Sequence, residues 1–418
     1  MGVLMPLYNA QISNQKMLFT FLIVLMGLAN VYVIPGTPLG IGELLFVLFA
    51  PFFVNKNISC SLQNGETGFI IWFIYTFFVT LFVLVYVGAP ISKFFSILRV
   101  AFYWGLMFVL GKSLFDYDFF KRGLFVFTFL LSSLIVVQFF VFIITGFYIP
   151  GYLLNATLND GGVTGYTMYQ GALLYGSILG FVRPSGFLCE PAHCAQFLIV
   201  PFAIVMTDPK LYLKKKVLLM LLISAIILIT ASSTGVAMLL FLWTLYIVTE
   251  KKLSFIRVPL IVFLSLFLVS FVGNGGGTEF KAVDRLLNLF NGQELDNSSN
   301  VRLNKGFEMY SFLPFSMKLF GSGIGLFDYL STYFNFENSL NCQNAFAGTF
   351  FMSGIIGAII FYFSMGVLFV KAGLLGKTLV CGYFVLSLGT GIFCCTQMVW
   401  IFLVILADIR EKNEISST

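Results

Sequence analysis

Three side chains that are able to do chemistry lie close together in the stretch RPSGFLCEPAH, from Arg183 to His193. Arg183 is a permanent cation, Glu190 is a carboxylic acid, and His193 is the single histidine of the chain. A carboxylate or an imidazole can take a proton from a hydroxyl group, and a guanidinium can hold two oxygens of a phosphate at once. These residue types therefore indicate proton transfer beside a phosphate group.

The spacing within this stretch predicts the start of a helix. Pro191 suits the first turn of a helix, and Gly186 allows a tight turn before it. Glu190 and His193 share one helical face because they are three positions apart, and Arg183 can fold back over both. A purely structural explanation is also open, in which Arg183 forms an ion pair with Glu190 and His193 caps a neighbouring helix.

The rest of the chain is strongly apolar, so these groups must be positioned by membrane helices. Of 418 residues, 59% are hydrophobic and 10% are charged, whereas a soluble domain carries about 25% charged residues. The mean hydropathy is +0.96. Continuous apolar runs favour an all-α polytopic membrane protein over a barrel. The first run lacks a cleavage site and is expected to remain as a signal anchor.

The apolar runs predict about twelve transmembrane helices. Their approximate ranges are 17–34, 39–54, 68–87, 94–111, 123–148, 190–207, 217–231, 234–249, 258–272, 346–370, 378–390 and 392–407. With both termini in the cytoplasm, most of the 24 basic residues also lie on that side, so the net charge of +6 is a topology signal rather than a sign of nucleic-acid binding. Residues 1–418 then form a single membrane domain with two long outer loops, 150–189 and 273–345.

The second outer loop adds two arginines and a glycine-rich turn. Arg285 and Arg302 stand among apolar and small polar residues rather than in a solvated run of charges. Outer arginines beside lipid suit a lipid-linked phosphate or diphosphate, because the guanidinium binds such oxygens in pairs. The segment FGSGIG contains Gly321, Gly323 and Gly325, which we expect to let the backbone approach another group closely.

These residues resemble a known family. RPSGFLCEPAHCAQF resembles the R-x-x-G-F-x-x-E-P-x-x-x-A stretch of bacterial O-antigen polymerases of the Wzy type, and DRL…SSNVR…FGSGIG is similar to that family's large outer loop. ASSTG, from Ala231 to Gly235, resembles its outer S-x-T-G turn. The related O-antigen ligases usually have a His-Asn pair where this chain has Gln343 and Asn344, which favours the polymerase.

The resemblance implies a glycosyltransferase C-like enzyme of the bacterial inner membrane. It would join undecaprenyl-diphosphate-linked oligosaccharides into O-antigen or capsular polysaccharide on the outer face, without a metal or other cofactor. Its partners would be membrane lipid, a flippase and a chain-length regulator, with no nucleic acid. The implied roles are catalysis for Glu190 and His193, diphosphate binding for Arg183, Arg285 and Arg302, and a substrate loop for Gly321, Gly323, Gly325 and Asn344.

Three other functions and several other polar residues stay open. One is a non-catalytic membrane scaffold, which would explain the spans but not the outer arginines. An O-antigen ligase would use the same donor, and a flippase or transporter would place charged groups near the bilayer midplane. No pair of matching broken helices is evident in the sequence, which weakens the transporter interpretation. Arg99, in the fourth predicted span, either extends outward to water or reaches the same outer cavity. Four outer tyrosines either stack on sugars or form an interfacial belt: Tyr166, Tyr169, Tyr310 and Tyr329.

One motif resembles a metal-binding pattern but is not expected to bind a metal ion. FDYDFF contains a D-x-D pattern, Asp116 and Asp118, which in nucleotide-sugar transferases binds a metal ion. Here it lies in a short predicted cytoplasmic turn beside Lys112 and Lys121, on the side away from the outer loops. The seven cysteines show no zinc-binding spacing either. We therefore expect no metal site.

Overall fold

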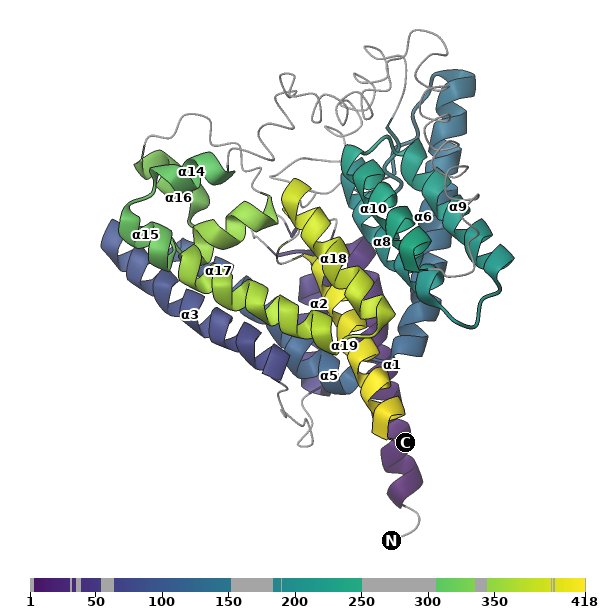
Figure 1. Ribbon diagram of the computed structural model, residues 1–418, viewed down its shortest axis with the longest axis horizontal. Coiled ribbons are helices and arrows are strands. Elements are labelled where there is room, and N and C mark those ends of the chain that lie inside the picture. The colour runs from purple at the N-terminus through teal and green to yellow at the C-terminus, as the bar shows by residue number, and fades with distance from the viewer. Residues whose placement is uncertain are drawn as a thin grey trace. The chain divides into compact units, whose positions relative to one another are not determined.

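The computed structural model describes residues 4–30, 32–34, 39–53, 64–151, 183–188, 190–249, 306–334, 344–391, 393 and 395–417. Within these ranges the secondary structure is helical, with one isolated bridge between Val33 and Gly40 and no strand (Figure 1). The all-helical fold class expected from the continuous apolar runs is therefore confirmed for the part of the chain that is described.

Several helices have the length and composition of membrane spans. Four of them are long and apolar enough to cross a membrane, namely Glu66–Val87, Ile91–Leu114, Tyr117–Thr145 and Ala345–Lys371. Five shorter apolar helices are Asn14–Ala29, Ile41–Phe53, Pro191–Thr207, Thr234–Thr249 and Leu374–Gly389. All nine overlap predicted spans, whereas the predicted span 258–272 lies outside the described residues. The chain is thus a membrane protein, and the count of about twelve spans stays a prediction.

The chain divides into two compact units, each built from segments that are distant in the sequence. Unit 1 consists of Met1–Lys16, Phe53–Phe115 and Leu295–Thr418. Unit 2 consists of Met17–Phe52 and Asp116–Glu294. The residues of the motif at 183–193 belong to unit 2, and the glycine-rich turn belongs to unit 1.

Unit 2 is a helical bundle centred on α8. Its helices are most of α1 (Leu4–Ala29) and α2 (Ile41–Phe53), with α6 (Tyr117–Thr145), α8 (Pro191–Thr207), α9 (Leu213–Ile229) and α10 (Ser233–Thr249). The helices α6, α9 and α10 all pack against α8, which is buried along nearly its whole length. A helix that is apolar all round suits this central place.

The two ends of this bundle differ in charge. The C-terminal end of α6 and the N-terminal end of α8 meet at one end, which we call the motif end, where Gln138 contacts Gly186. At the other end, which we call the lysine end, Lys121 near the start of α6 contacts Asp208 just after α8. The run Lys214–Lys216 opens α9 at the lysine end. A cytoplasmic location of the lysine end stays a prediction, which rests on the tendency of basic residues to gather on that side of a membrane.

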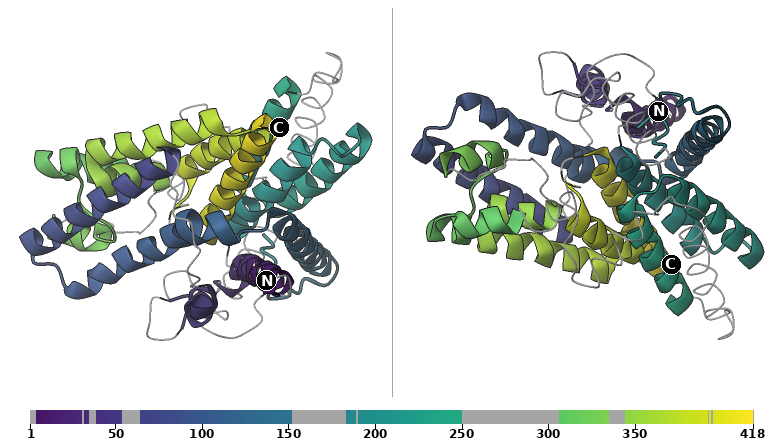
Figure 2. Two further views of the ribbon diagram at one scale, coloured as in Figure 1. Left: turned by 90° about the horizontal axis from the view of Figure 1, so that it is seen from below. Right: turned by 90° about the horizontal axis from the view of Figure 1, so that it is seen from above.

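Unit 1 is built around two long helices that run side by side, α3 and α17 (Figures 1 and 2). Its helices are α3 (Asn64–Val87), η1 (Ile91–Phe94), α4 (Phe95–Trp104), the π-helical η2 (Gly105–Leu110), α5 (Gly111–Leu114), α14 (Gly306–Phe312), α15 (Phe315–Phe320), α16 (Phe327–Tyr333), α17 (Ala345–Lys371), α18 (Leu374–Gly389) and α19 (Thr396–Ser417). An aromatic core holds them together, in which Phe69 contacts Trp104, Phe361 and Phe402. Such buried aromatic pairs add to the apolar area that each ring removes from solvent.

Candidate functional site

The turn before α8 is fixed to α6 by the side-chain amide of Gln138. This amide accepts a hydrogen bond from the N–H of Gly186 at 2.9 Å and donates to the carbonyls of Gly186 and Ile149, each at 3.0 Å. Gly186 has a φ of +61°, and a Cβ there would lie 2.4 Å from Cδ1 of Leu131. The turn therefore needs glycine at this position, and two buried hydrogen bonds between Gln138 and Gly186 hold it in place.

Two further contacts tie this turn to its neighbours. The thiol of Cys194, in the first turn of α8, donates a hydrogen bond to the carbonyl of Ser185 at 2.6 Å. Tyr148, which is buried just after α6, hydrogen bonds with Ser185. The backbone between Arg183 and α8 is thus held from both sides, which favours a single arrangement of the side chains that it carries.

The three charged or titratable groups of the motif lie on this fixed turn. Arg183, Glu190 and His193 are all half-buried. Glu190 precedes the first helical residue of α8 with extended backbone angles, and its carbonyl accepts from the N–H of His193 at 3.1 Å. Its carboxylate makes no capping hydrogen bond to α8. The predicted turn, glycine and helix start are all present, while the catalytic roles of Glu190 and His193 stay predictions.

The ASSTG segment lies beside this turn in space. It forms the connection from α9 to α10, where Ser232 Oγ accepts from the N–H of Gly235 at 3.3 Å and Ala231 has a φ of +49°. A Cβ at Gly235 would lie 2.8 Å from the Cβ of Ala195, in the second turn of α8. Two of the motifs that carry the family resemblance therefore meet at the motif end of unit 2.

The glycine-rich turn of unit 1 packs into a break in α17. Inside α17, Gly354 has non-helical angles, with a φ of 63° and a ψ of −173°. The N–H of Ser322 donates to the carbonyl of Phe351 at 2.9 Å, and the N–H of Gly323 donates to that of Met352 at 3.0 Å. The turn thus supplies the donors that the break removes from the helix, as buried backbone carbonyls require.

Each of the three glycines in this turn is enclosed by the chain itself. All three have positive φ: +105° at Gly321, +89° at Gly323 and +73° at Gly325. A Cβ at Gly321 would lie 2.4 Å from the carbonyl oxygen of Met352, and one at Gly323 would lie 2.9 Å from the Cα of Thr80. A Cβ at Gly325 would lie 2.2 Å from Oγ of Ser96 in α4. The close approach expected of these glycines is therefore an approach to α17, α3 and α4, and their contact with a substrate stays a prediction.

Asn344 has a structural role at the start of α17. Its side chain accepts a hydrogen bond from the N–H of Ala347 at 2.7 Å, which is the N-cap arrangement, and the residue is 1% exposed. The next residue, Ala345, donates its N–H to the carbonyl of Thr390 at 2.8 Å, just after α18. A place for Asn344 in the substrate loop stays a prediction.

Several predicted residues fall outside the described part of the chain or contact the chain itself. Arg285, Arg302, Tyr166 and Tyr169 are outside the described residues. The hydroxyl of Tyr310 donates to the carbonyl of Lys318 at 2.8 Å, and that of Tyr329 donates to Val87 at 3.2 Å. Arg99 is half-buried in α4 and interacts electrostatically with Cys395 near the start of α19.

The D-x-D pattern forms the start of a helix. Asp116 caps α6 by accepting a hydrogen bond from the N–H of Phe119 at 3.0 Å, and Asp118 is exposed in the first turn of α6. Acidic groups are favourable there because they face the positive end of the helix dipole. Among the residues that the structure describes, no group of three His, Cys, Asp or Glu side chains is arranged to hold a metal ion.

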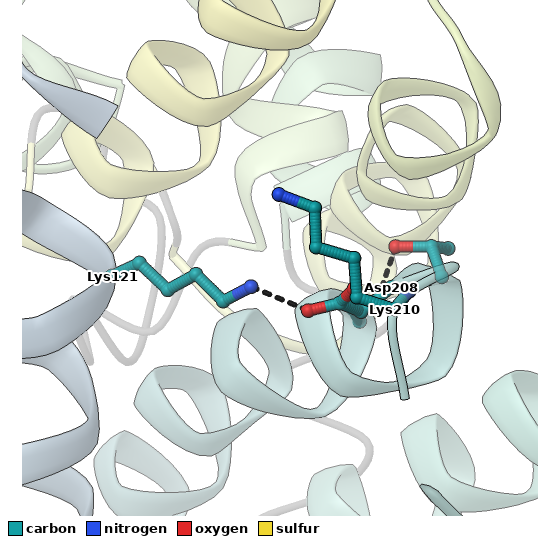
Figure 3. A network of polar contacts seen from close by, with 5 residues as sticks. Lys121, Asp208 and Lys210 are labelled. Carbon is teal, nitrogen blue, oxygen red and sulfur yellow. Dashed lines mark hydrogen bonds and ion pairs between the residues drawn. The ribbon is translucent and has the colours of Figure 1, made fainter. Parts of the chain in front are cut away.

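An ion pair joins α6 to the end of α8 at the lysine end. Lys121 Nζ lies 2.5 Å from Oδ2 of Asp208, whose other oxygen accepts from the N–H of Lys210 at 2.8 Å (Figure 3). Burial of the Asp208 carboxyl acts to raise its pKa, but the hydrogen bonds from Lys121 and Lys210 outweigh burial and lower that pKa. The pair fixes the lysine end of the bundle, as Gln138 fixes the motif end.

Gln138 is the residue of this site that sequence reasoning missed. A signal for it exists, because it is the single polar amide in the apolar run LIVVQFFVFII of α6. A polar side chain within a membrane span is costly unless it has partners, so it marks a structural or functional contact. Comparison with protein-family models and with curated proteins finds no match to this chain.

Proposed function

We propose that this chain is a polysaccharide polymerase that joins oligosaccharide units carried on undecaprenyl diphosphate. The observation that carries the proposal is the locked turn at the motif end. It presents Arg183, Glu190 and His193 on a backbone that Gln138 holds with two buried hydrogen bonds to Gly186. These groups stand at the opposite end of unit 2 from Lys121 and its neighbouring lysines. A reaction on the outer membrane face needs such a separation from the cytoplasmic charges.

The proposed reaction uses these residues in distinct roles. A hydroxyl oxygen of the acceptor unit bonds to the anomeric carbon of the donor chain, and the bond from that carbon to the diphosphate breaks. The electron pair leaves with the diphosphate, whose growing charge Arg183 offsets, joined by Arg285 and Arg302 from the second outer loop. The hydroxyl proton passes to Glu190 or to His193, which contributes about 10²- to 10⁴-fold in rate.

The break in α17 is the feature that bears on a transporter function. Broken helices in transporters offer free backbone groups to a substrate near the bilayer midplane. Here the carbonyls of Phe351 and Met352 at the break accept hydrogen bonds from Ser322 and Gly323, so they are occupied by the protein. The break therefore does not favour a transporter function over a polymerase function, and we propose the polymerase.

Complementation of cells that lack the protein tests the proposal. We expect Arg183→Ala to be inserted normally but to leave single-unit chains in place of the polysaccharide ladder. Arg122→Ala is the matched control, because Arg122 is exposed on α6 near the lysine end, and it should give a normal ladder. A normal ladder from Arg183→Ala would contradict the proposal. In cells without the protein, long chains left on the lipid carrier would instead indicate a ligase, and single units retained inside the cell a transporter.

A further inference from the structure

Three short helices of unit 1 form a cap on the end of α3. The helices α14, α15 and α16 lie together beside the last turns of α3 (Figure 1). Apolar side chains from this cap pack with Val83, Leu84 and Val87 of α3 and with Phe351 of α17. The cap residues in this cluster are Met309, Leu313, Met317, Leu326 and Leu330. Because Val87 ends the candidate span Glu66–Val87, the cap sits at the depth where that span ends.

Tyrosine hydroxyls fix the orientation of this cap. Tyr75 of α3 donates to the carbonyl of Phe320 at 2.7 Å, and Tyr329 of α16 donates to the carbonyl of Val87 at 3.2 Å. Within the cap, Tyr310 donates to the carbonyl of Lys318 at 2.8 Å. These bonds join α14 to α15 and the whole cap to α3, so one side of the cap packs against α3.

The other side of the cap exposes large aromatic rings. Phe315 is 79% exposed and Phe312 is 64% exposed, on either side of the turn at Leu313 and Pro314. The adjoining end of α3 is exposed in the same way, with Val85 at 85% and Phe82 at 71%. The apolar surface of a candidate membrane span therefore continues onto the cap. Phenylalanine has no hydrogen-bonding group, and this surface continues the apolar surface of a candidate span, so it suits acyl chains.

Basic residues accompany these rings. Lys318 lies in the last turn of α15, and Lys93 lies in η1, where a Cβ at Gly325 of the cap would lie 3.8 Å from the Lys93 carbonyl oxygen. Both lysines are half-buried. Short helices that combine exposed aromatic rings with lysines lie in the plane of a membrane surface, with the rings in the acyl region and the ammonium groups near lipid phosphates.

We propose that α14–α16 form an interfacial membrane anchor at the Val87 end of α3. Phe312 and Phe315 enter the acyl region of the bilayer, and Lys93 and Lys318 lie near phospholipid phosphates. The segment is thus a lipid-contacting platform within the region that the sequence predicts to be an outer loop. This inference rests on the membrane class of the chain and not on the proposed reaction.

Quenching by brominated lipids tests this placement. Phe312→Trp and Phe315→Trp each add one indole at an exposed aromatic position, so folding should be kept. In liposomes of phosphatidylglycerol and phosphatidylethanolamine with bromine on the acyl chains, we expect most of the added emission of both variants to be lost. The control is Glu411→Trp, at an exposed and charged position near the end of α19, whose added emission should persist.

The outcomes separate lipid from other occupants of this surface. Loss of the added emission at both positions, but not at 411, supports the anchor. Added emission at 315 that brominated lipid leaves unchanged overturns it. The anchor is also overturned if brominated lipid does not quench the added emission and that emission shifts with protein concentration. A second copy of the chain would then cover the rings.

Discussion

The turn before α8 and the glycine-rich turn before α16 are held in different ways. The turn at Arg183–Glu190 is held by the side chain of Gln138, and it carries charged groups that stay half-buried. The turn at Gly321–Gly325 is held mainly by its own backbone N–H groups, which donate into the break of α17 and to the hydroxyl of Thr80, and it carries no charged side chain. In the first arrangement a side chain of another helix holds the backbone of a turn that carries charged residues, whereas the second uses its own polar groups for packing.

The comparison teaches how differently two sequence signals should be interpreted. A glycine cluster indicates that a backbone approaches another group closely, but it does not say whether that group is a ligand or the protein itself. A cluster of charges in a chain with few charges is harder to explain by packing, because each buried charge is costly without a partner or ligand. The proposed function therefore rests mainly on the charged cluster of unit 2.

The largest expected effect comes from breaking the glycine turn. Gly321→Ala places a side chain at a φ of +105° and within 2.4 Å of the Met352 carbonyl. Backbone strain and overpacking together should lower the free energy of unfolding by about 4 kcal/mol. The thermal unfolding midpoint of the purified protein in detergent measures this. Gly366→Ala in α17 is the control, because nothing lies within 4 Å of its Cβ position, and it should be at least as stable as the parent.

Removing the amide that holds the turn at Gly186 should lower the free energy of unfolding somewhat less. Gln138→Met keeps the volume of the side chain but leaves the N–H and carbonyl of Gly186 and the carbonyl of Ile149 without this partner. We expect a loss of about 3 kcal/mol, since each buried unsatisfied group costs about 1–3 kcal/mol. Thr145→Val, at the exposed end of α6, should shift the unfolding midpoint little. If Gln138→Met is as stable as the parent, the turn is not held as described.

The smallest expected effect concerns the α8–α9 connection, which is held by an ion pair. The pKa of Asp208 is lowered on folding, so its ionised form stabilises the protein above the unfolded-state pKa of about 3.9. That contribution, about 1 kcal/mol, is lost as the pH falls through the folded-state pKa. Asp208→Asn should therefore unfold at a lower temperature than the parent at pH 7, and the difference should shrink as the pH falls below about 3.9 and vanish once the pH lies below the folded-state pKa.

The matched control for this pH dependence is Asp118→Asn, an exposed carboxylate in the first turn of α6. It should change the unfolding midpoint little at either pH. A difference between Asp208→Asn and the parent that persists or grows in acid would assign the stabilisation to something other than the ionised pair with Lys121.

Local patterns predicted much of the fold. The apolar runs located the helices because a membrane span needs a continuous apolar stretch, and Gly186 with Pro191 located the turn and the start of α8. Asn344 was assigned to a substrate loop by position in the resemblance, although an asparagine before an apolar helix is also a capping signal, and it caps α17.

Contacts between distant segments could not be predicted in this way. The break at Gly354 depends on donors from Ser322 and Gly323, which a local pattern in α17 does not contain. The role of Gln138 depends on Gly186, which follows much later in the chain. Likewise, nothing in the sequence of the second outer loop shows that α14–α16 would pack against the end of α3.

The most direct test of the central claim is polymer formation by the purified protein in liposomes. The substrate is undecaprenyl-diphosphate-linked oligosaccharide labelled in its sugar, and the readout is label in chains longer than one unit. The account predicts polymer from the parent and at least about 100-fold less from Arg183→Ala, at an unchanged unfolding midpoint. Absence of polymer from the parent, or equal rates from both proteins, would contradict it.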